Sequence, residues 1–394
     1  MTPQPRMKVI FGAIAILAAA GCPPAFSNEY SLDYRATARY EHNDNVTLRP
    51  EDSVEISGAK ASLPITFRAR SDRMDASVLL NIESAKYDVS SYDSDDQNLQ
   101  GKASYQFERG QLEGNAGFKR DSTRDSEFLD TGAIGLRAVR RENGTLGGSG
   151  SYMLTERNGL IAGADYSDVT FAGERYVDYQ YVSGYGGWLH NWSERIGLRL
   201  QAYASHYENE SEIKVSSETL GLQAGFETQI TERLSAFLLA GYVNVDTEYS
   251  TNLPVAVPLN DSQGAFQGEG SLEYEEERYQ LSLELYSGSR PSADGFLLQA
   301  TQLDMTYRYL LSKRSRFDLT LIAGNSDALD KRIANNRDYF RGEIRLDYRL
   351  AQAWYVAGTY IYSYQDREVF PGSADSNAVY LSVEYRPGKR SWSR

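Results

Sequence analysis

The chain has 394 residues and carries 41 Lys and Arg against 54 Asp and Glu, which gives a formal net charge of −13. This acidic excess excludes a general affinity for nucleic acid, because binding to phosphates needs clustered cations. Cys22 is the only cysteine, so the chain can form no internal disulfide and no cysteine-rich metal site. Tyrosine is abundant, at 29 copies, and its apolar ring with a polar tip suits the boundary between membrane and water.

Residues 1–27 have the pattern of a secretory signal peptide. Arg6 and Lys8 form a basic start, residues 9–20 form a short apolar core, and residues 25–27, Ala-Phe-Ser, provide a small-residue cleavage site. The apolar core is shorter than the roughly 20 residues that a transmembrane helix needs. Cleavage would remove two basic residues and leave 39 against 54 acidic ones, a net charge of −15.

Cys22 leaves a lipoprotein anchor open as an alternative, since lipid is attached at such a cysteine. Against it, Ala19 occupies a place that a larger aliphatic residue usually holds, and Pro23 follows directly. Plain signal cleavage is therefore the prediction. The rest of the chain is predicted to form one domain at residues 28–386 and a basic tail at residues 387–394.

The processed chain opens with an alternation of side chains that is typical of a strand. From Tyr30 to Tyr40, every second residue is Tyr, Leu or Ala, and the residues between them are Ser, Asp, Arg or Thr. Successive side chains of a strand point to opposite faces, so this pattern predicts one apolar and one polar face. Pro64 lies inside the next such segment and lacks an N–H group, so we expect a local bulge there. Similar alternation occupies residues 61–68, 112–119, 160–166, 196–204, 234–242, 281–285, 317–323, 340–349 and 379–385.

A short polar turn recurs between these segments. It reads Thr155-Glu156-Arg157, Ser193-Glu194-Arg195 and Thr231-Glu232-Arg233, with a spacing of 38 residues. Degenerate copies occupy residues 71–73, 108–110, 276–278, 312–314 and 351–353. A fixed period indicates one repeated supersecondary unit, and two alternating runs around a tight turn form a β-hairpin.

Longer acidic segments, rich in Gly, Ser and Asn, separate the hairpins. Short turns on one side and long loops on the other are typical of an outer-membrane barrel, with the turns in the periplasm and the loops outside. We therefore predict an all-β fold, a closed antiparallel transmembrane β-barrel of about 18 strands, in the bacterial outer membrane. Residues 121–145 exceed a normal loop and admit a strand at 132–139, an inserted loop or a hairpin extension. The strand number therefore ranges from about 16 to 20.

The polar strand face holds the candidate functional residues. Nine of them are predicted to line the lumen: Arg35, Arg39, Arg199, Arg308, Arg341, Glu343, Arg345, Asp347 and Arg349. Because the signs are mixed, two interpretations stay open. Opposite charges that pair across strands would hold the wall rigid. Alternatively, the face forms a hydrated, zwitterionic channel that guides a polar solute.

The sequence offers little support for catalysis. The three histidines, His42, His190 and His206, fall near strand ends and form no cluster, which argues against a metal site. No order of Ser, His and acid can be read, since such triads are recognised by geometry. The acidic tip at residues 90–97 is rich in oxygen ligands, but its spacing does not match a calcium loop. We predict a protein that is not an enzyme and that needs no cofactor or metal.

Three motifs carry a resemblance to a known family. They are Tyr40-Glu41-His42-Asn43-Asp44-Asn45-Val46, then Lys119-Arg120-Asp121-Ser122-Thr123 leading to Asp130-Thr131-Gly132, and the repeated Thr-Glu-Arg hairpin. In these motifs the chain resembles the porin-like outer-membrane β-barrels that are encoded with bacterial exopolysaccharide and exosortase systems. The resemblance implies an outer-membrane location and a role in the export of surface polysaccharide, with no catalytic residues to carry over.

The leading hypothesis is a passive, hydrated channel, with exopolysaccharide as the solute that the resemblance implies. Tyr203, Trp188 and Tyr286 would offer rings to a sugar if they face inward. The alternatives are a general or substrate-specific nutrient porin, a structural or adhesive barrel, and a membrane-embedded hydrolase. The expected partners are outer-membrane lipid, a polysaccharide or small polar solute, and periplasmic export components, but no nucleic acid. No feature of the sequence decides the oligomeric state.

Overall fold

The computed structural model describes residues 29–124, 126–127, 139–173, 175–251, 260–330, 335–368 and 370–393. The predicted signal peptide, the Asp130-Thr131-Gly132 motif and nearly all of the candidate strand at 132–139 lie outside these residues. Among the described residues, no helix has the length and apolar character needed to cross a bilayer.

The described chain is almost entirely β-structure, and its strands run mostly for 13 to 15 residues. They are β1 (Glu29–Tyr34), β2 (Ala36–Asn43), β3 (Ile56–Arg70), β4 (Met74–Tyr87), β5 (Ser94–Phe107), β6 (Gly110–Ser122), β7 (Arg140–Met153), β8 (Asn158–Phe171), β9 (Tyr179–Asn191), β10 (Ile196–Asn209), β11 (Ile213–Thr231), β12 (Leu234–Thr251), β13 (Asp261–Glu275), β14 (Tyr279–Pro291), β15 (Leu297–Leu310), β16 (Ser315–Ala328), β17 (Arg337–Arg349), β18 (Trp354–Arg367), β19 (Phe370–Tyr385) and β20 (Arg390–Ser393). A short 3-10 turn, η1 (Ser90–Tyr92), follows β4. Strands of this length exceed the 9–11 residues needed to cross the hydrocarbon layer.

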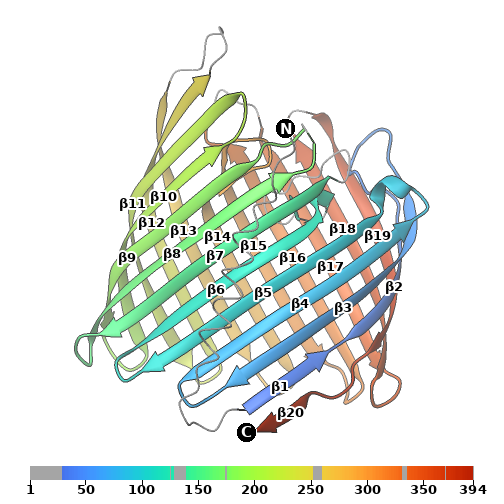
Figure 1. The fold of residues 1–394 in the computed structure, drawn as a ribbon, viewed down its shortest axis with the longest axis horizontal. Coiled ribbons are helices and arrows are strands. Elements are labelled where there is room, and N and C mark those ends of the chain that lie inside the picture. Colours follow the sequence, from blue (N-terminus) through green and yellow to red (C-terminus); the bar gives the residue numbers. More distant parts are fainter. Residues whose placement is uncertain are drawn as a thin grey trace.

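The strands close into a barrel, as Figure 1 shows. From β3 to β19 each strand pairs antiparallel with its neighbours in chain order, and β19 pairs with β2. β1 and β2 form one strand interrupted at Arg35, since both pair with β3. The result is a closed antiparallel barrel of 18 strands, which confirms the predicted fold class and strand number. Closure removes the open sheet edge, whose unpaired backbone groups would each cost several kcal/mol in lipid.

Pro64 does not produce the expected bulge. The pairing of β3 with β4 passes through Pro64 and Asn81 without a shift of register. The carbonyl of Pro64 also accepts a hydrogen bond from the N–H of Arg35 at 3.1 Å. Because proline has no N–H to return, the irregularity falls in the neighbouring strand, where β1 ends and β2 begins. Register shifts occur instead between β11 and β12 and between β18 and β19.

β20 lies within the segment that the sequence separates as a basic tail. It pairs with β1 and places Trp392 opposite Tyr30, at the lower rim of the barrel in Figure 1. The rings of Tyr30, Phe67 and Trp392 pack with centroids 6.1 to 6.4 Å apart. Such rings suit the membrane–water boundary. The chain thus leaves β19 at Tyr385, resumes pairing in β20 after a break at residues 386–389, and ends near an aromatic cluster.

The two faces of the strands differ as the alternation predicts. On β11, Leu220 and Leu222 are each 65% exposed on the outer surface, whereas Thr219 and Gln223 are 0% and 2% exposed. Many other large apolar side chains around the barrel are exposed in the same alternating way. An apolar outer surface around a polar interior is the arrangement of a transmembrane barrel, because lipid contacts one face and water the other.

The loop between β14 and β15 folds into the barrel, at the end opposite to the short turns. The side-chain amide of Asn209 on β10 donates to the carbonyl of Gly295 at 2.8 Å, and the N–H of Val177 donates to the carbonyl of Ala293 at 2.9 Å. Gly295 has φ +90°, a left-handed conformation that favours glycine. An apolar cluster joins this loop to the wall formed by β8 to β13; its members are Val169, Phe171, Tyr179, Tyr207, Val215, Val243, Val245, Ala265, Ala293, Leu297 and Leu329. The lumen is therefore narrowed at the long-loop end.

Candidate functional site

Eight of the nine residues proposed for the lumen occupy inward positions of their strands, and Arg35 lies at the break between β1 and β2. On β17, Ile344 and Leu346 are 42% and 52% exposed on the outer surface. Arg341, Glu343, Arg345, Asp347 and Arg349 alternate with these two residues and so share the opposite face. Arg39 likewise alternates with the exposed Tyr40, and Arg199 alternates with the exposed Leu200. Arg308 lies opposite Asp318 in the pair of β15 with β16.

Two buried carboxylates form the centre of an ion-pair network near the short-turn rim. Asp347 pairs with Arg316 at 2.7 Å, with Arg345 at 2.9 Å and with Arg386 at 3.2 Å. Glu384 pairs with Arg345 and, at 2.5 Å, with Arg386. Asp347 and Glu384 are only 5% and 2% exposed. The network therefore connects the inner faces of β16, β17 and β19.

Further pairs extend this network in both directions around the wall. Asp318 contacts Arg316 at 2.8 Å and Arg308 at 3.0 Å, which adds β15. Arg35, at the break between β1 and β2, approaches Glu384 at 3.9 Å. Charges of both signs alternate along this stretch, so it is no ring of a single sign. For these residues the geometry favours the interpretation that pairing holds the wall rigid.

Two further predicted residues lie against aromatic rings. The guanidinium of Arg39 lies 4.5 Å from the ring centre of Tyr380, and that of Arg199 lies 5.0 Å from the ring centre of Tyr185. Cation–π contacts of this kind hold an arginine side chain flat against an aromatic face. Arg341, Glu343 and Arg349 share the inward face of β17 with Arg345 and Asp347. The structure therefore brings Arg35, Arg308, Arg345 and Asp347 into one network and places Arg39 and Arg199 against aromatic rings elsewhere on the wall.

A polar cavity of about 370 Å³ follows the inner wall of β3 to β7. Its charged lining residues are Arg68, Asp75, Lys102 and Glu113. Arg68 donates to Asp75 at 2.7 Å, so part of this charge is paired. Small residues keep the adjacent wall open: a Cβ atom on Gly147 would lie 2.2 Å from Oδ1 of Asp165. This side of the lumen offers a hydrated surface of mixed charge.

A second, larger cavity of about 720 Å³ lies at the rim formed by the short turns. It is lined by two of the Thr/Ser-Glu-Arg turns, around Arg157 and Arg195, and by inward residues such as Glu227 and Glu273. The repeated turn that marks the sequence thus contributes charged groups to one mouth of the barrel.

Aromatic and amide side chains project from other parts of the inner wall. The hydroxyls of Tyr181 and Tyr203 are 2.8 Å apart. The guanidinium of Arg290 lies 4.0 Å from the ring centre of Tyr286 and donates to the side-chain carbonyl of Gln302 at 3.1 Å. Tyr203 and Tyr286 are two of the three rings considered for sugar stacking, and both lie inside the barrel. They offer aromatic faces and hydroxyl groups to a polar solute.

The third ring, Trp188, points outward and does not meet that condition. It is 39% exposed and stacks on His190 with ring centroids 5.2 Å apart. His42 and His206 also lie at outward positions, where they approach Glu55 and Glu218 at 3.8 and 3.9 Å. Within the described residues, no group of three or more His, Cys, Asp or Glu side chains is arranged to hold a metal ion.

In the acidic tip after β4, the side-chain carboxylate of Asp93 accepts hydrogen bonds from nearby groups of the protein. Asp93 accepts the backbone N–H of Tyr87 at 2.9 Å and the ammonium of Lys86 at 3.0 Å. These two donors hold the pKa of Asp93 below its ordinary value. The tip is thereby stabilised by protein donors.

Glu41 is an interior anchor that sequence reasoning missed. It is 1% exposed, pairs with Arg124, and accepts the hydroxyls of Tyr87 at 2.7 Å and Tyr380 at 3.2 Å. Arg124 lies two residues after the end of β6, so this pair ties the chain at that point to the inner wall of β2. The alternation at Tyr40 places Glu41 inside, but a loop partner 83 residues away leaves no signal in a single sequence.

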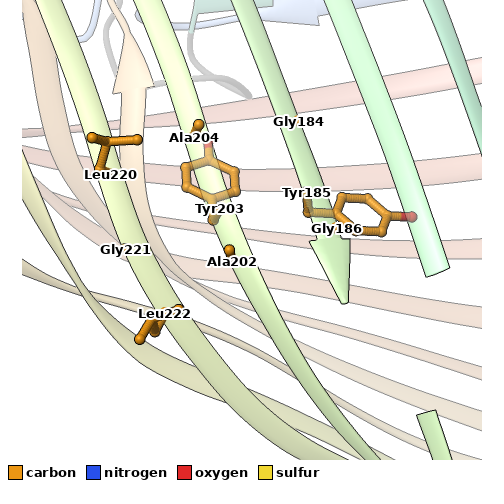
Figure 2. Close-up of a pocket in the computed structure, with 9 residues that line it drawn as sticks. All are labelled: Gly184, Tyr185, Gly186, Ala202, Tyr203, Ala204, Leu220, Gly221 and Leu222. Carbon is orange, nitrogen blue, oxygen red and sulfur yellow. The ribbon is translucent and has the colours of Figure 1, made fainter. Parts of the chain in front are cut away.

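Figure 2 shows an apolar notch where β9, β10 and β11 run side by side. Gly184, Gly186, Ala202 and Ala204 leave the space, and Leu220 and Leu222 border it. These six residues occupy outward positions, where a transmembrane barrel contacts lipid. The notch is therefore part of the outer surface and no part of the solute path.

No family model and no curated protein matches the chain. Among solved structures, the chain is similar to Pseudomonas aeruginosa OccK2 in complex with glucuronate, with 13% identity, 91% and 98% of the two chains covered and a TM-score of 0.46. Acinetobacter baumannii OccAB3 has 12% identity, 92% and 99% coverage and a TM-score of 0.42. A BenF-like porin from Pseudomonas fluorescens Pf-5 has 9% identity, 91% and 99% coverage and a TM-score of 0.45.

At these values the similarity supports no conclusion about the family or function of the chain, and none of these comparisons supports the link with exopolysaccharide. The strand pairing itself defines a closed antiparallel β-barrel of 18 strands with an apolar outer surface.

Proposed function

We propose that this protein is a passive outer-membrane channel for small polar solutes. The observation that carries the proposal is the closed barrel itself, apolar outside and lined inside by paired charges and polar cavities. A solute that leaves bulk water loses hydration, and a wall of alternating donors and acceptors replaces part of it. No bond is made or broken in such passage, so the inner residues act only by contact and charge.

Small solutes are favoured over an exported polysaccharide because the lumen is narrowed by loops. The contact of Gly295 with Asn209 brings the loop between β14 and β15 onto the inner wall, and the Arg124–Glu41 pair holds the chain just after β6 against it. An extended polymer would need a wide, continuous opening, whereas a monosaccharide or small acid needs a short passage. The nutrient-porin alternative is therefore preferred here to the exopolysaccharide hypothesis suggested by the resemblance.

The proposed orientation follows the lengths of the connections. The short turns, including the cavity around Arg157 and Glu273, face the periplasm, and the long loops face the outside. The strand number is even, so β1 and the last strand both end at the periplasmic rim. The mixed-charge cavity along β3 to β7 then forms the periplasmic half of the path.

Recording across a planar bilayer tests the proposal. Purified protein should give stepwise, ohmic currents in KCl, and millimolar monosaccharides or small organic acids should reduce them. A high-molecular-weight acidic polysaccharide should leave the current unchanged. Interruption by the polymer alone would restore the export hypothesis, and the absence of any current would favour the adhesive or hydrolase alternatives.

A further inference from the structure

Two arginines face each other on the inner wall near the long-loop end. Arg337 is the first residue of β17, and its register partner across the strand pair is Arg367, the last residue of β18. Arg337 is 6% exposed. Like charges directly opposite each other destabilise a sheet, so this position requires nearby negative charge.

Asp294 supplies part of that charge. The Oδ2 atom of Asp294, in the loop between β14 and β15, lies 2.6 Å from Nη2 of Arg337. Two other donors of the same guanidinium, Nε and Nη1, are buried and have no hydrogen-bond partner. The Nδ2 atom of Asn335, two residues earlier, is also buried without a partner. All three of these nitrogen atoms carry N–H groups. They would therefore be satisfied by a group that accepts hydrogen bonds.

Charged groups from several elements gather around this position. The charges of Arg337, Asp294 and Arg175 act on Arg367. Arg175 and Tyr176 belong to the loop between β8 and β9, so two loops and two strands meet here. The charge of Glu127 also acts on Tyr176. The carboxylate of Glu127 lies 3.8 Å from the guanidinium of Arg141, which partly neutralises it.

We propose that Arg337, with Arg367 across the strand pair, binds an oxyanion, the carboxylate or phosphate group of a small solute. Charge-assisted hydrogen bonds from a buried guanidinium to such an oxygen are about twice as strong as neutral ones. Arginine suits this task because its donors are rigid and always charged. The inference rests on the proposed channel function and deepens it by naming the solute class, small anions that enter at the long-loop end.

Asp294 distinguishes this proposal from a purely structural role of the pair. If the site binds an anion, the carboxylate of Asp294 competes with it, and Asp294→Asn should strengthen binding. If the pair only ties the loop to β17, then Asp294→Asn and Arg337→Gln should act in the same direction, by loosening the loop. The two variants are therefore expected to have opposite effects on the affinity for anions.

The test uses the full barrel and two probes, sodium phosphate and galacturonate, with neutral galactose for comparison. Block of single-channel current in KCl gives an apparent affinity, and calorimetric titration of the detergent-solubilised barrel gives the same quantity without conduction. Arg337→Gln should weaken binding of the anions by about tenfold, and Asp294→Asn should tighten it. Arg120→Gln removes an outward guanidinium on β6, paired with Glu142 at 3.3 Å, and should change neither quantity.

Each outcome decides a separate point. A response to only one probe identifies the preferred oxyanion, carboxylate or phosphate. A barrel that conducts but binds neither anion overturns this inference and leaves the channel standing. Equal shifts of Arg337→Gln and Asp294→Asn would also overturn it. Absence of conduction overturns the proposed function, and the calorimetric titration still decides whether the site exists. Arg337→Lys, which keeps the charge, should retain intermediate affinity if the variant barrels are folded.

Discussion

Replacing Asp347 by alanine is expected to lower the free energy of unfolding by about 3 kcal/mol, since removing one partner of a buried ion pair leaves the other charge uncompensated. Asp347 is 5% exposed and is shared by Arg316, Arg345 and Arg386. Glu384 remains as a partner of two of these arginines, which limits the loss. The excess of positive charge should also shift the channel towards anions. Urea denaturation in detergent measures the first effect, and the reversal potential in a KCl gradient measures the second.

Asp72→Ala is the matched control for Asp347→Ala. Asp72 lies in the exposed turn between β3 and β4, so the same change of charge should alter stability by less than about 0.5 kcal/mol. Equal urea midpoints and equal reversal potentials for the two variants would mean that the network around Asp347 carries neither stability nor selectivity.

Replacing Arg124 by alanine is expected to open the lumen and to destabilise the barrel by about 3 kcal/mol. Glu41 would then remain buried, at 1% exposure, beside the hydroxyls of Tyr87 and Tyr380 and without a compensating cation from Arg124. The chain just after β6 would lose the pair that ties it to β2. Single-channel recording should show a larger conductance than the natural protein, because the side chain of Arg124 no longer lies against the inner wall beside Glu41.

A double-mutant cycle separates the pair from its two residues. Arg124→Ala, Glu41→Ala and the double variant should give a coupling energy of about 1 to 3 kcal/mol, as expected for residues in direct contact. The double variant should conduct like Arg124→Ala. Additive stabilities together with natural conductance in all three variants would show that this contact neither holds the chain after β6 in place nor narrows the lumen.

The fold was readable from the sequence because both of its periods are local. Alternation at Tyr30 to Tyr40, and again at residues 340–349, fixes the two faces of a strand, and the 38-residue recurrence of Thr155-Glu156-Arg157 fixes the hairpins. Lipid strengthens this signal, since a slip of one residue would turn charges outward. The bulge predicted at Pro64 was wrong. The sequence of one strand does not show which neighbouring strand becomes irregular where proline lacks an N–H group.

The site was only partly readable, because it depends on contacts between distant segments. The inward positions of Arg345 and Asp347 follow from alternation, but their pairing with Glu384 and Arg386 depends on which strands meet at closure. Glu41, Asp294 and Arg337 acquire their roles from loops that fold across the lumen. Loop paths follow no sequence period, and side chains that act through such paths leave no local pattern.

A cysteine scan along β5 tests most directly whether one face of the barrel meets water and the other lipid. Cys22 is the only cysteine, so its replacement by serine gives a clean background for single cysteines at residues 99–104 in lipid vesicles. A closed barrel predicts that a water-soluble maleimide modifies cysteines at Gln100, Lys102 and Ser104, and that Leu99, Gly101 and Ala103 are protected. Modification at all six positions, or at none of the inward three, would contradict a water-filled barrel.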